Sequence, residues 1–182
     1  VETTIRRLVE TGADEKTFRQ NFATLTLGSG AAAMVLTRGD LAPDAPRFLG
    51  GVTLAATEHN RLCVGQPTEM VTDASALLVA GIGLAKKTLA KAVDALTWKL
   101  DEIDHFIMHQ VGHTHMAKLC AALGVDQSKV FMTFEEFGNI GPAAVPITLA
   151  KAVEAGRIEK GDRIALMGIG SGINCSMMEV VW

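Results

Sequence analysis

Strand-like and helix-like apolar patterns alternate along the chain from residue 48 to the C-terminus. A short apolar run or an apolar–polar alternation predicts a strand, whereas apolar residues three and four positions apart predict a helix. These patterns predict strands at residues 48–57, 101–108, 130–134, 163–167 and 175–182, and helices at residues 74–96, 113–123 and 142–155. Strands that alternate with helices are typical of a layered α/β fold with a mostly parallel sheet. We therefore predict an α/β fold for this part of the chain.

The first 37 residues follow a different order. Residues 2–11 predict a helix, and residues 22–27 and 31–36 predict two strands. Gly28-Ser29-Gly30 would be the tight link between those strands. Residues 58–73, which follow the next strand, have no periodic pattern and predict an irregular segment.

A linker is predicted where Pro43 and Pro46 follow a polar turn. We expect residues 1–40 to be the end of an earlier, similar unit, and residues 47–182 to be a second unit. Because Val1 already lies within a helical pattern, we expect the chain to be a fragment or a processed product.

Composition excludes several classes of partner. The 182-residue chain has a net charge of −3 and no basic cluster, which argues against nucleic acid. Hydrophobic residues make up 48%, so we expect much of the surface to face another subunit or a missing domain. No apolar run reaches the roughly 20 residues of a membrane span, and no signal-peptide pattern is present, so we predict a cytoplasmic protein. Cys63, Cys120 and Cys175 are odd in number and scattered, so they imply no disulfide framework.

His109 follows the apolar strand of residues 104–108, where α/β sheets usually meet their ligands. A neutral imidazole at that place can donate one hydrogen bond to a developing oxyanion. The alternative is a core histidine bonded to a backbone carbonyl. Asn139 lies at the start of a predicted helix, where it could cap the helix or point its amide N–H at a substrate oxygen. Two neutral donors suit a carbonyl oxygen that becomes an enolate, and they do not suit phosphate.

A glycine loop at residues 168–172 follows the next strand. It could simply link two strands, because glycine tolerates the positive φ angles of tight turns. Alternatively, its backbone N–H groups, including that of Gly170, and the Ser171 hydroxyl could line an acyl pocket. A nucleotide loop is disfavoured because no P-loop lysine is present and the following segment predicts a strand.

Metal and cysteine chemistry are both disfavoured. His109, His113 and His115 are close in sequence, but Gly112 interrupts them and no carboxylate or cysteine nearby completes a set of ligands, so we predict no metal. Cys63 lies in an irregular segment, where an inert thiol is more common than a nucleophile.

Taken together, His109-Gln110, Gly138-Asn139 and the glycine loop resemble the C-terminal half of β-ketoacyl synthase III, in the thiolase superfamily. The resemblance implies a thiolase-like α/β fold, which in the complete enzyme is a five-layer αβαβα homodimer. This chain would supply the C-terminal half plus the last strands of the N-terminal half. The resemblance also implies a Cys-His-Asn triad in which His109 and Asn139 are the last two members. The cysteine would lie upstream of Val1, in the N-terminal half, which is therefore an implied partner.

Departures from the carrier-protein enzymes indicate a branch of that family. Those enzymes usually have His-Gln-Ala-Asn and Gly-Asn-Thr-Ser, and this chain differs from both after His109-Gln110 and after Gly138-Asn139. Residues 57–65, 138–143 and 170–174 are more similar to the branch that joins two fatty acyl-CoAs head to head in olefin biosynthesis. That branch also has a serine in the glycine loop, here Ser171.

The resemblance implies a Claisen condensation of acyl thioesters, with His109 and Asn139 stabilising the enolate and no cofactor beyond the acyl-CoA or acyl-carrier-protein substrate. Two alternatives stay open: a decarboxylating 3-oxoacyl synthase III that uses malonyl-carrier protein, and a non-catalytic half-synthase that pairs with an active subunit. A dinucleotide-binding module is a weaker third.

Overall fold

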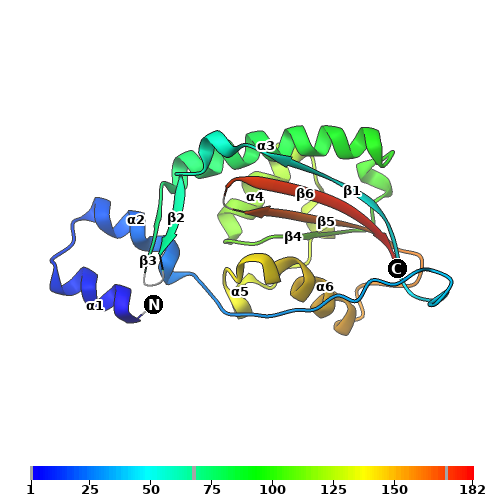
Figure 1. Cartoon of the computed structure of the whole chain (residues 1–182), viewed down its shortest axis with the longest axis horizontal. Helices are drawn as coiled ribbons and strands as arrows, with labels where there is room; N and C mark the ends of the chain where they lie inside the picture. The colour runs from blue at the N-terminus through cyan, green and yellow to red at the C-terminus, as the bar shows by residue number, and fades with distance from the viewer. Residues whose placement is uncertain (1, 67–68, 171) are drawn as a thin grey trace.

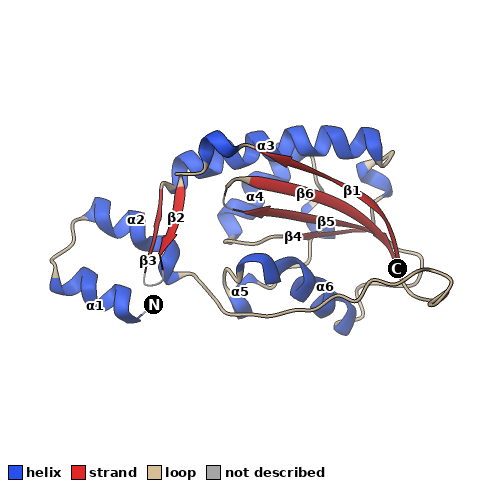
Figure 2. Ribbon diagram, viewed as in Figure 1, coloured by secondary structure: helices blue, strands red, loops and turns tan. Residues whose placement is uncertain are grey.

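A four-stranded sheet between two layers of helices forms the body of the protein (Figure 1). The computed structural model describes residues 2–66, 69–170 and 172–182. Its strands are β1 Arg47–Ala55, β2 Cys63–Gln66, β3 Glu69–Thr72, β4 His105–Met108, β5 Arg163–Gly170 and β6 Asn174–Val181 (Figure 2). Its α-helices are α1 Glu2–Glu10, α2 Glu15–Leu25, α3 Ala74–Ala95, α4 His113–Leu123, α5 Phe134–Phe137 and α6 Ala144–Glu154. The α/β class predicted from the sequence is confirmed.

The sheet has the order β1-β6-β5-β4 and is mixed. β4 and β5 are parallel, whereas β6 is antiparallel to both β5 and β1. The prediction of a mostly parallel sheet is therefore wrong. Only a few residues separate the end of β5 at Gly170 from the start of β6 at Asn174, and a parallel connection needs a crossover of a dozen or more residues.

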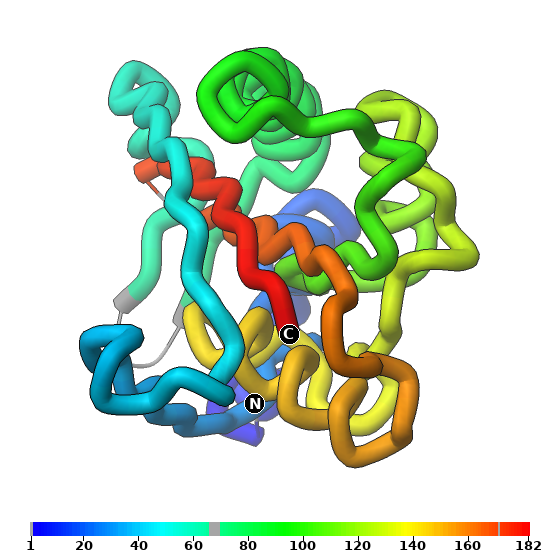
Figure 3. The backbone as a smooth tube through the Cα atoms, turned by 90° about the vertical axis from the view of Figure 1, so that its right-hand side faces the viewer, coloured from blue at the N-terminus to red at the C-terminus, as the bar shows by residue number. Residues whose placement is uncertain are grey.

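Both faces of the sheet are buried. α3 and α4 cover one face and α6 covers the other, as the view turned by 90° also shows (Figure 3). Along β5, Ala165 and Met167 belong to the core beneath α3 and α4, while Ile164 and Leu166 belong to the core against α6. This period of two explains why β5 is apolar without interruption from Ile164 to Met167.

The predicted helices are confirmed. α1, α3 and α4 lie within a residue or two of their predicted ranges. Gly124 ends α4 in the left-handed conformation, with φ of 69°. The helix predicted from residue 142 begins as a 3-10 turn, Gly141–Ala143, and continues as α6.

Both strands predicted before residue 37 are wrong. Residues 22–25 belong to α2, which Asp14 caps by accepting a hydrogen bond from the Thr17 N–H at 2.8 Å. The buried Thr24 then fixes α2 against β3, because its hydroxyl bonds both backbone groups of Met70 at 3.1 Å. Residues 31–36 form neither helix nor strand, and Val35 is 92% exposed. An apolar segment becomes a strand only through backbone pairing, and sequence pattern alone does not supply the partner.

Three further segments differ from prediction. Residues 58–73 contain the antiparallel hairpin β2–β3 instead of an irregular run. The strand predicted at 101–108 begins only at His105, because Leu100–Glu102 is a 3-10 turn. The strand predicted at 130–134 is reduced to a single bridge between Val130 and Phe106. The division of the chain into units 1–40 and 47–182 stays a prediction.

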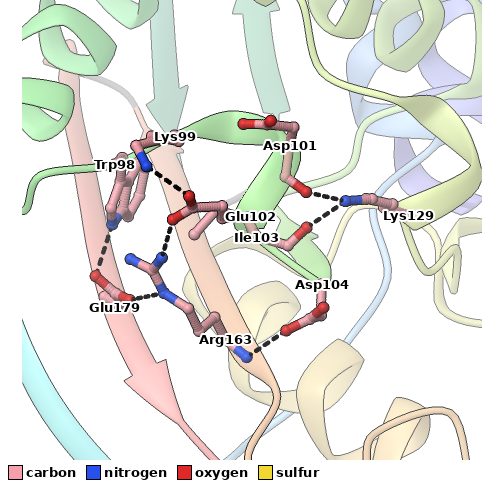
Figure 4. A network of polar contacts seen from close by, with 9 residues as sticks. All are labelled: Trp98, Lys99, Asp101, Glu102, Ile103, Asp104, Lys129, Arg163 and Glu179. Atoms are coloured by element: carbon pink, nitrogen blue, oxygen red, sulfur yellow. Dashed lines mark hydrogen bonds and ion pairs between the residues drawn. The ribbon is translucent and has the colours of Figure 1, made fainter.

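A polar network holds the end of the sheet where β5 begins (Figure 4). Arg163 Nε donates to Glu179 Oε1 at 2.8 Å, and Trp98 Nε1 donates to Glu179 Oε2 at 2.8 Å. The Arg163 side chain also donates to Glu102, and its backbone N–H donates to Asp104. Hydrogen bonding to Glu179 raises the pKa of Arg163 above its usual value. The predicted site residue His109 lies at the opposite end of the sheet, beyond the carboxyl end of β4.

Candidate active site

His109 lies just beyond the carboxyl end of β4, and its backbone N–H donates to the carbonyl of Met167 on β5 at 2.9 Å. The residue is partly buried. Burial lowers the pKa of the imidazole below 6.5, a hydrogen bond with the Gly141 backbone opposes that shift, and the charge of His115 reinforces it. The balance keeps the imidazole of His109 neutral near pH 7.

Asn139 is held through its backbone by a segment far away in sequence. Its N–H donates to the Thr26 carbonyl at 2.9 Å, and its carbonyl accepts from the Gly28 N–H at 2.9 Å. These two bonds form a parallel bridge centred on Leu27. The residues that follow α2 therefore fix the position of the Asn139 main chain.

The side-chain oxygen of Asn139 accepts the Gly141 N–H at 3.1 Å. The capping role considered from sequence is thus present, because this bond satisfies a backbone donor at the start of the 3-10 turn. It also fixes which way the carboxamide faces, and it leaves the Nδ2 hydrogens as the donors that Asn139 can offer to a ligand.

Gly141 connects the two predicted catalytic residues. Its backbone lies close enough to the His109 ring to raise the pKa of that ring, and its N–H donates to Asn139 Oδ1. Gly141 has φ of 58°, a conformation that favours glycine. The structure therefore brings His109 and Asn139 together around a single glycine, which sequence reasoning had recorded only as part of a motif.

Gly28 is a second residue that sequence reasoning missed. A Cβ atom at this position would lie 1.8 Å from the Phe137 carbonyl oxygen, so only glycine permits the bridge to Asn139. The opposing Gly138 has φ of 67°, and a Cβ there would lie 2.8 Å from the Thr26 oxygen. The signal was visible in Gly28-Ser29-Gly30, but the pattern was interpreted as a link between strands.

The glycine loop is described only in part. Ser171 lies outside the described residues. Gly170 ends β5 three residues after Met167, whose carbonyl is bonded to His109. A Cβ atom at Gly170 would meet no atom of the described residues within 4 Å, so those residues leave space beside it.

A cavity of 570 Å³ lies between the end of α2 and the segment that leads to Asn139. Leu25, Leu27 and residues 134–138 line it together with His113, which pairs with Glu135 at 3.0 Å. The segment that precedes Asn139 is therefore accessible from this cavity.

Two of the three cysteines lie where burial disfavours a thiolate. Burial raises the pKa of Cys120 and of Cys175, which disfavours their thiolates. Cys63 is part of β2, where the Thr72 hydroxyl donates to its sulfur at 3.4 Å. Within residues 2–66, 69–170 and 172–182, no three His, Cys, Asp or Glu side chains come together as metal ligands would. In those same residues, no helix combines the length and apolar character needed to cross a membrane.

Residues 93–182 match the family described as 3-Oxoacyl-[acyl-carrier-protein (ACP)] synthase III C terminal. The chain is 54% identical over 181 residues to the acyl-CoA:acyl-CoA alkyltransferase of Xanthomonas campestris, covering 100% of this chain and 54% of that protein. It is 37% identical over 177 residues to the protein of the same name from Shewanella oneidensis, covering 91% of this chain and 51% of that one.

Solved structures of Xanthomonas campestris OleA have the same fold. A cysteine-to-serine variant with bound lauric acid and lauroyl-CoA matches with a TM-score of 0.95 at 54% identity, over 100% of this chain and 54% of that one. A histidine-to-alanine variant matches equally well over 53% of its length. The chain thus spans about half the length of these relatives. It has the thiolase-like fold of these structures, and its residues 93–182 are similar to the C-terminal domain of 3-oxoacyl-ACP synthase III.

Proposed function

We propose that this chain is the enolate-stabilising half of an enzyme that condenses two fatty acyl-CoAs into a β-ketoacyl product. A cysteine outside the chain takes the first acyl group as a thioester and releases CoA. A base in the cysteine-bearing half takes a proton from Cα of the second acyl-CoA, and the resulting carbanion attacks the thioester carbonyl. A carbon–carbon bond forms, the carbon–sulfur bond breaks, and the cysteine thiolate leaves.

The observation that supports the proposal is the arrangement of His109 and Asn139 around Gly141. Asn139 keeps its Nδ2 hydrogens for a ligand, and the neutral His109 ring, which has a single N–H to donate, lies beside it at the carboxyl end of the parallel pair β4–β5. Preorganised donors of this kind stabilise the charge that develops on a carbonyl oxygen, because they need not reorient during the reaction. We assign His109 and Asn139 to the oxygen of the second acyl-CoA.

The substrate class follows from the relatives, two of which are named acyl-CoA:acyl-CoA alkyltransferases. A relative's variant structure with lauroyl-CoA further supports a fatty acyl thioester. The implied partners are the cysteine-bearing half of the fold and, in the assembled enzyme, a second copy of the whole. Gly170 and Ser171 would line the acyl site, and the reaction needs no cofactor beyond its thioester substrates.

The test uses a preparation in which this chain is united with the cysteine-bearing half. It is incubated with lauroyl-CoA, while intact mass follows acylation and product analysis follows condensation. Removal of one oxyanion donor typically costs about 10²–10³ in rate, so His109→Ala and Asn139→Ala should lose condensation by that factor and still acylate. His105→Ala, at the other end of β4, is the matched histidine control and should still condense. Normal condensation by both site variants would exclude the proposal.

A malonyl-dependent synthase is the second candidate, and the family matched by residues 93–182 favours it. It is separated by its by-product. Condensation of malonyl-carrier protein releases carbon dioxide, whereas head-to-head condensation of two acyl-CoAs to the β-ketoacyl product does not. Product formation from lauroyl-CoA alone therefore supports the first reaction, and a strict requirement for malonyl-carrier protein supports the second.

A further inference from the structure

Gln110, the residue after His109, is deeply buried and bonded on three sides. It is 2% exposed. Its Oε1 accepts the Thr133 N–H at 2.9 Å and the Phe134 N–H at 3.0 Å, and its Nε2 donates to the Phe131 carbonyl at 2.8 Å. The Gln110 side chain therefore satisfies three backbone groups of residues 131–134, a segment outside the strands of the sheet.

That segment leads directly to Asn139. The Phe134 carbonyl accepts the Gly138 N–H at 2.8 Å, and Gly138 precedes Asn139. The route from one catalytic residue to the other is thus short. It runs from His109 through the peptide bond to Gln110, through one hydrogen bond to Phe134, and through the turn of α5 to Asn139.

A second link extends the same unit to α6. The Thr133 hydroxyl is bonded to the Thr148 hydroxyl at 2.7 Å, and both threonines are buried, with Thr148 at 0% exposure. α6 follows the Gly141–Ala143 turn, whose first residue donates its N–H to Asn139 Oδ1 and whose backbone influences the pKa of His109. The Gln110, Thr133 and Thr148 side chains therefore join the loop after β4, the segment before α5, and the helix after the site.

We propose that Gln110, supported by the Thr133–Thr148 pair, is a positioning residue that sets the spacing between His109 and Asn139 for enolate stabilisation. This inference rests on the proposed function and adds a residue that does not itself touch the substrate. Buried polar networks with satisfied partners specify one local geometry, because any other arrangement leaves a buried group unpaired. A displacement of about 1 Å between catalytic groups can cost about 10²-fold in rate.

The test compares Gln110→Met with Gln110→Glu in the preparation described above. Methionine keeps the length of the side chain and removes all three hydrogen bonds. Glutamate keeps the acceptor for Thr133 and Phe134 and, when protonated, can donate to Phe131. We expect Gln110→Met to lower kcat for condensation by at least about tenfold while acylation changes by less than about threefold. Gln110→Glu should recover most of the loss.

Thr148→Val serves where Gln110→Met does not fold, because it removes one hydroxyl at nearly constant volume. It should lower condensation by about threefold to tenfold, without an equal fall in acylation. Thr88→Val is its matched control: Thr88 is also 0% exposed, but it lies on α3, across the sheet, and its hydroxyl bonds the Leu84 carbonyl of its own helix. This variant should change stability and leave the ratio of condensation to acylation unchanged.

The outcomes separate this inference from the proposed function. Loss of condensation in His109→Ala but not in folded Gln110→Met or Thr148→Val overturns the positioning role alone. Equal loss of condensation and acylation in the Gln110 variants also overturns it, since general unfolding would then explain the effect. Normal condensation by both His109→Ala and Asn139→Ala overturns the proposed function itself.

Discussion

Replacing Gly28 with alanine tests the bridge between the end of α2 and Asn139. The added Cβ would lie 1.8 Å from the Phe137 carbonyl oxygen and 2.7 Å from Ile140 Cγ2. The oxygen is a backbone atom and cannot rotate away, so the two segments must separate by about 1.2 Å before the contact reaches 3.0 Å. Both bridging hydrogen bonds of Asn139 cross this gap, and both would lengthen or break.

A shift of that size moves the Asn139 amide relative to His109. Because a misplacement of about 1 Å can cost about 10²-fold in rate, we expect Gly28→Ala to lower condensation by about that factor. Overpacking of this kind also destabilises a protein by about 1–3 kcal/mol. Acylation, which needs neither enolate donor in the proposed mechanism, should fall much less.

The assay measures condensation, acylation and urea unfolding on the same preparation. Gly83→Ala is the matched control, since it makes the same change on α3, where a Cβ would meet nothing within 4 Å. Condensation by Gly28→Ala within about threefold of the unmodified enzyme would refute the reasoning, because the bridge would then have no role in holding Asn139.

Three other outcomes can be measured directly. Burial lowers the pKa of His109 and of His115 below 6.5, so the unfolded chain binds protons that the folded chain does not. This contribution to stability is complete above pH 6.5 and is lost as the pH falls through the lowered pKa values of the two folded-state histidines. Urea unfolding at a series of pH values measures it, and a free energy of unfolding that does not change below pH 6.5 would contradict it. Arg163→Met leaves the carboxylate of Glu179, which is 2% exposed, without its cation. It should destabilise the fold by about 3 kcal/mol, near the lower limit for buried ion pairs because the Arg163 side chain is 28% exposed. A loss of stability below about 1 kcal/mol in chemical unfolding would instead match a surface ion pair. Gly83→Ala should raise the free energy of unfolding by about 0.5–1 kcal/mol, because glycine is unfavourable inside a helix, and a lower melting temperature would contradict this.

The sequence was sufficient for elements whose periodicity agrees with their burial. α3 was predicted closely because its apolar stripe faces the sheet, with Leu84, Leu89 and Ala92 buried on one side. β5 was predicted because its residues alternate between two buried cores. Local pattern and tertiary packing select the same structure in both cases.

The sequence pattern gave wrong predictions where contacts between distant segments determine the secondary structure. Residues 22–27 alternate in a way that fits a strand, but Asp14 caps a helix there and Thr24 holds that helix on β3. Residues 31–36 are apolar enough for a strand, and their backbone shows no regular pairing within the described residues. The Asp14 cap is a local signal for the helix, but the contact of Thr24 with β3 and the lack of pairing at residues 31–36 depend on which segment lies alongside.

The site shows the same division between residue type and geometry. His109 and Asn139 could be proposed because an imidazole and an amide at element ends are typical oxyanion donors. Their orientation could not, since it depends on Gly28 and Gly141, whose role lies in backbone atoms alone. The type of side chain at the site could thus be predicted from the sequence, whereas backbone contacts between distant segments could not.

Backbone anchoring has a consequence for how this site tolerates change. Asn139 is held by the main chain of Thr26 and Gly28, and His109 by the main chain of Met167, so the substituents of those three residues are not what fixes the donors. Side chains around the site can therefore vary without moving the donors, provided that the backbone keeps its path. Two kinds of substitution would change the path of the backbone. One replaces Gly28, where two backbone segments are in close contact, and the other replaces Gln110, whose amide bonds three backbone groups. Apart from His109 and Asn139 themselves, the residues most sensitive to substitution should therefore be ones without a chemical function of their own. We expect Thr26→Val and Met167→Leu to retain condensation and Gly28→Ala and Gln110→Met to lose it.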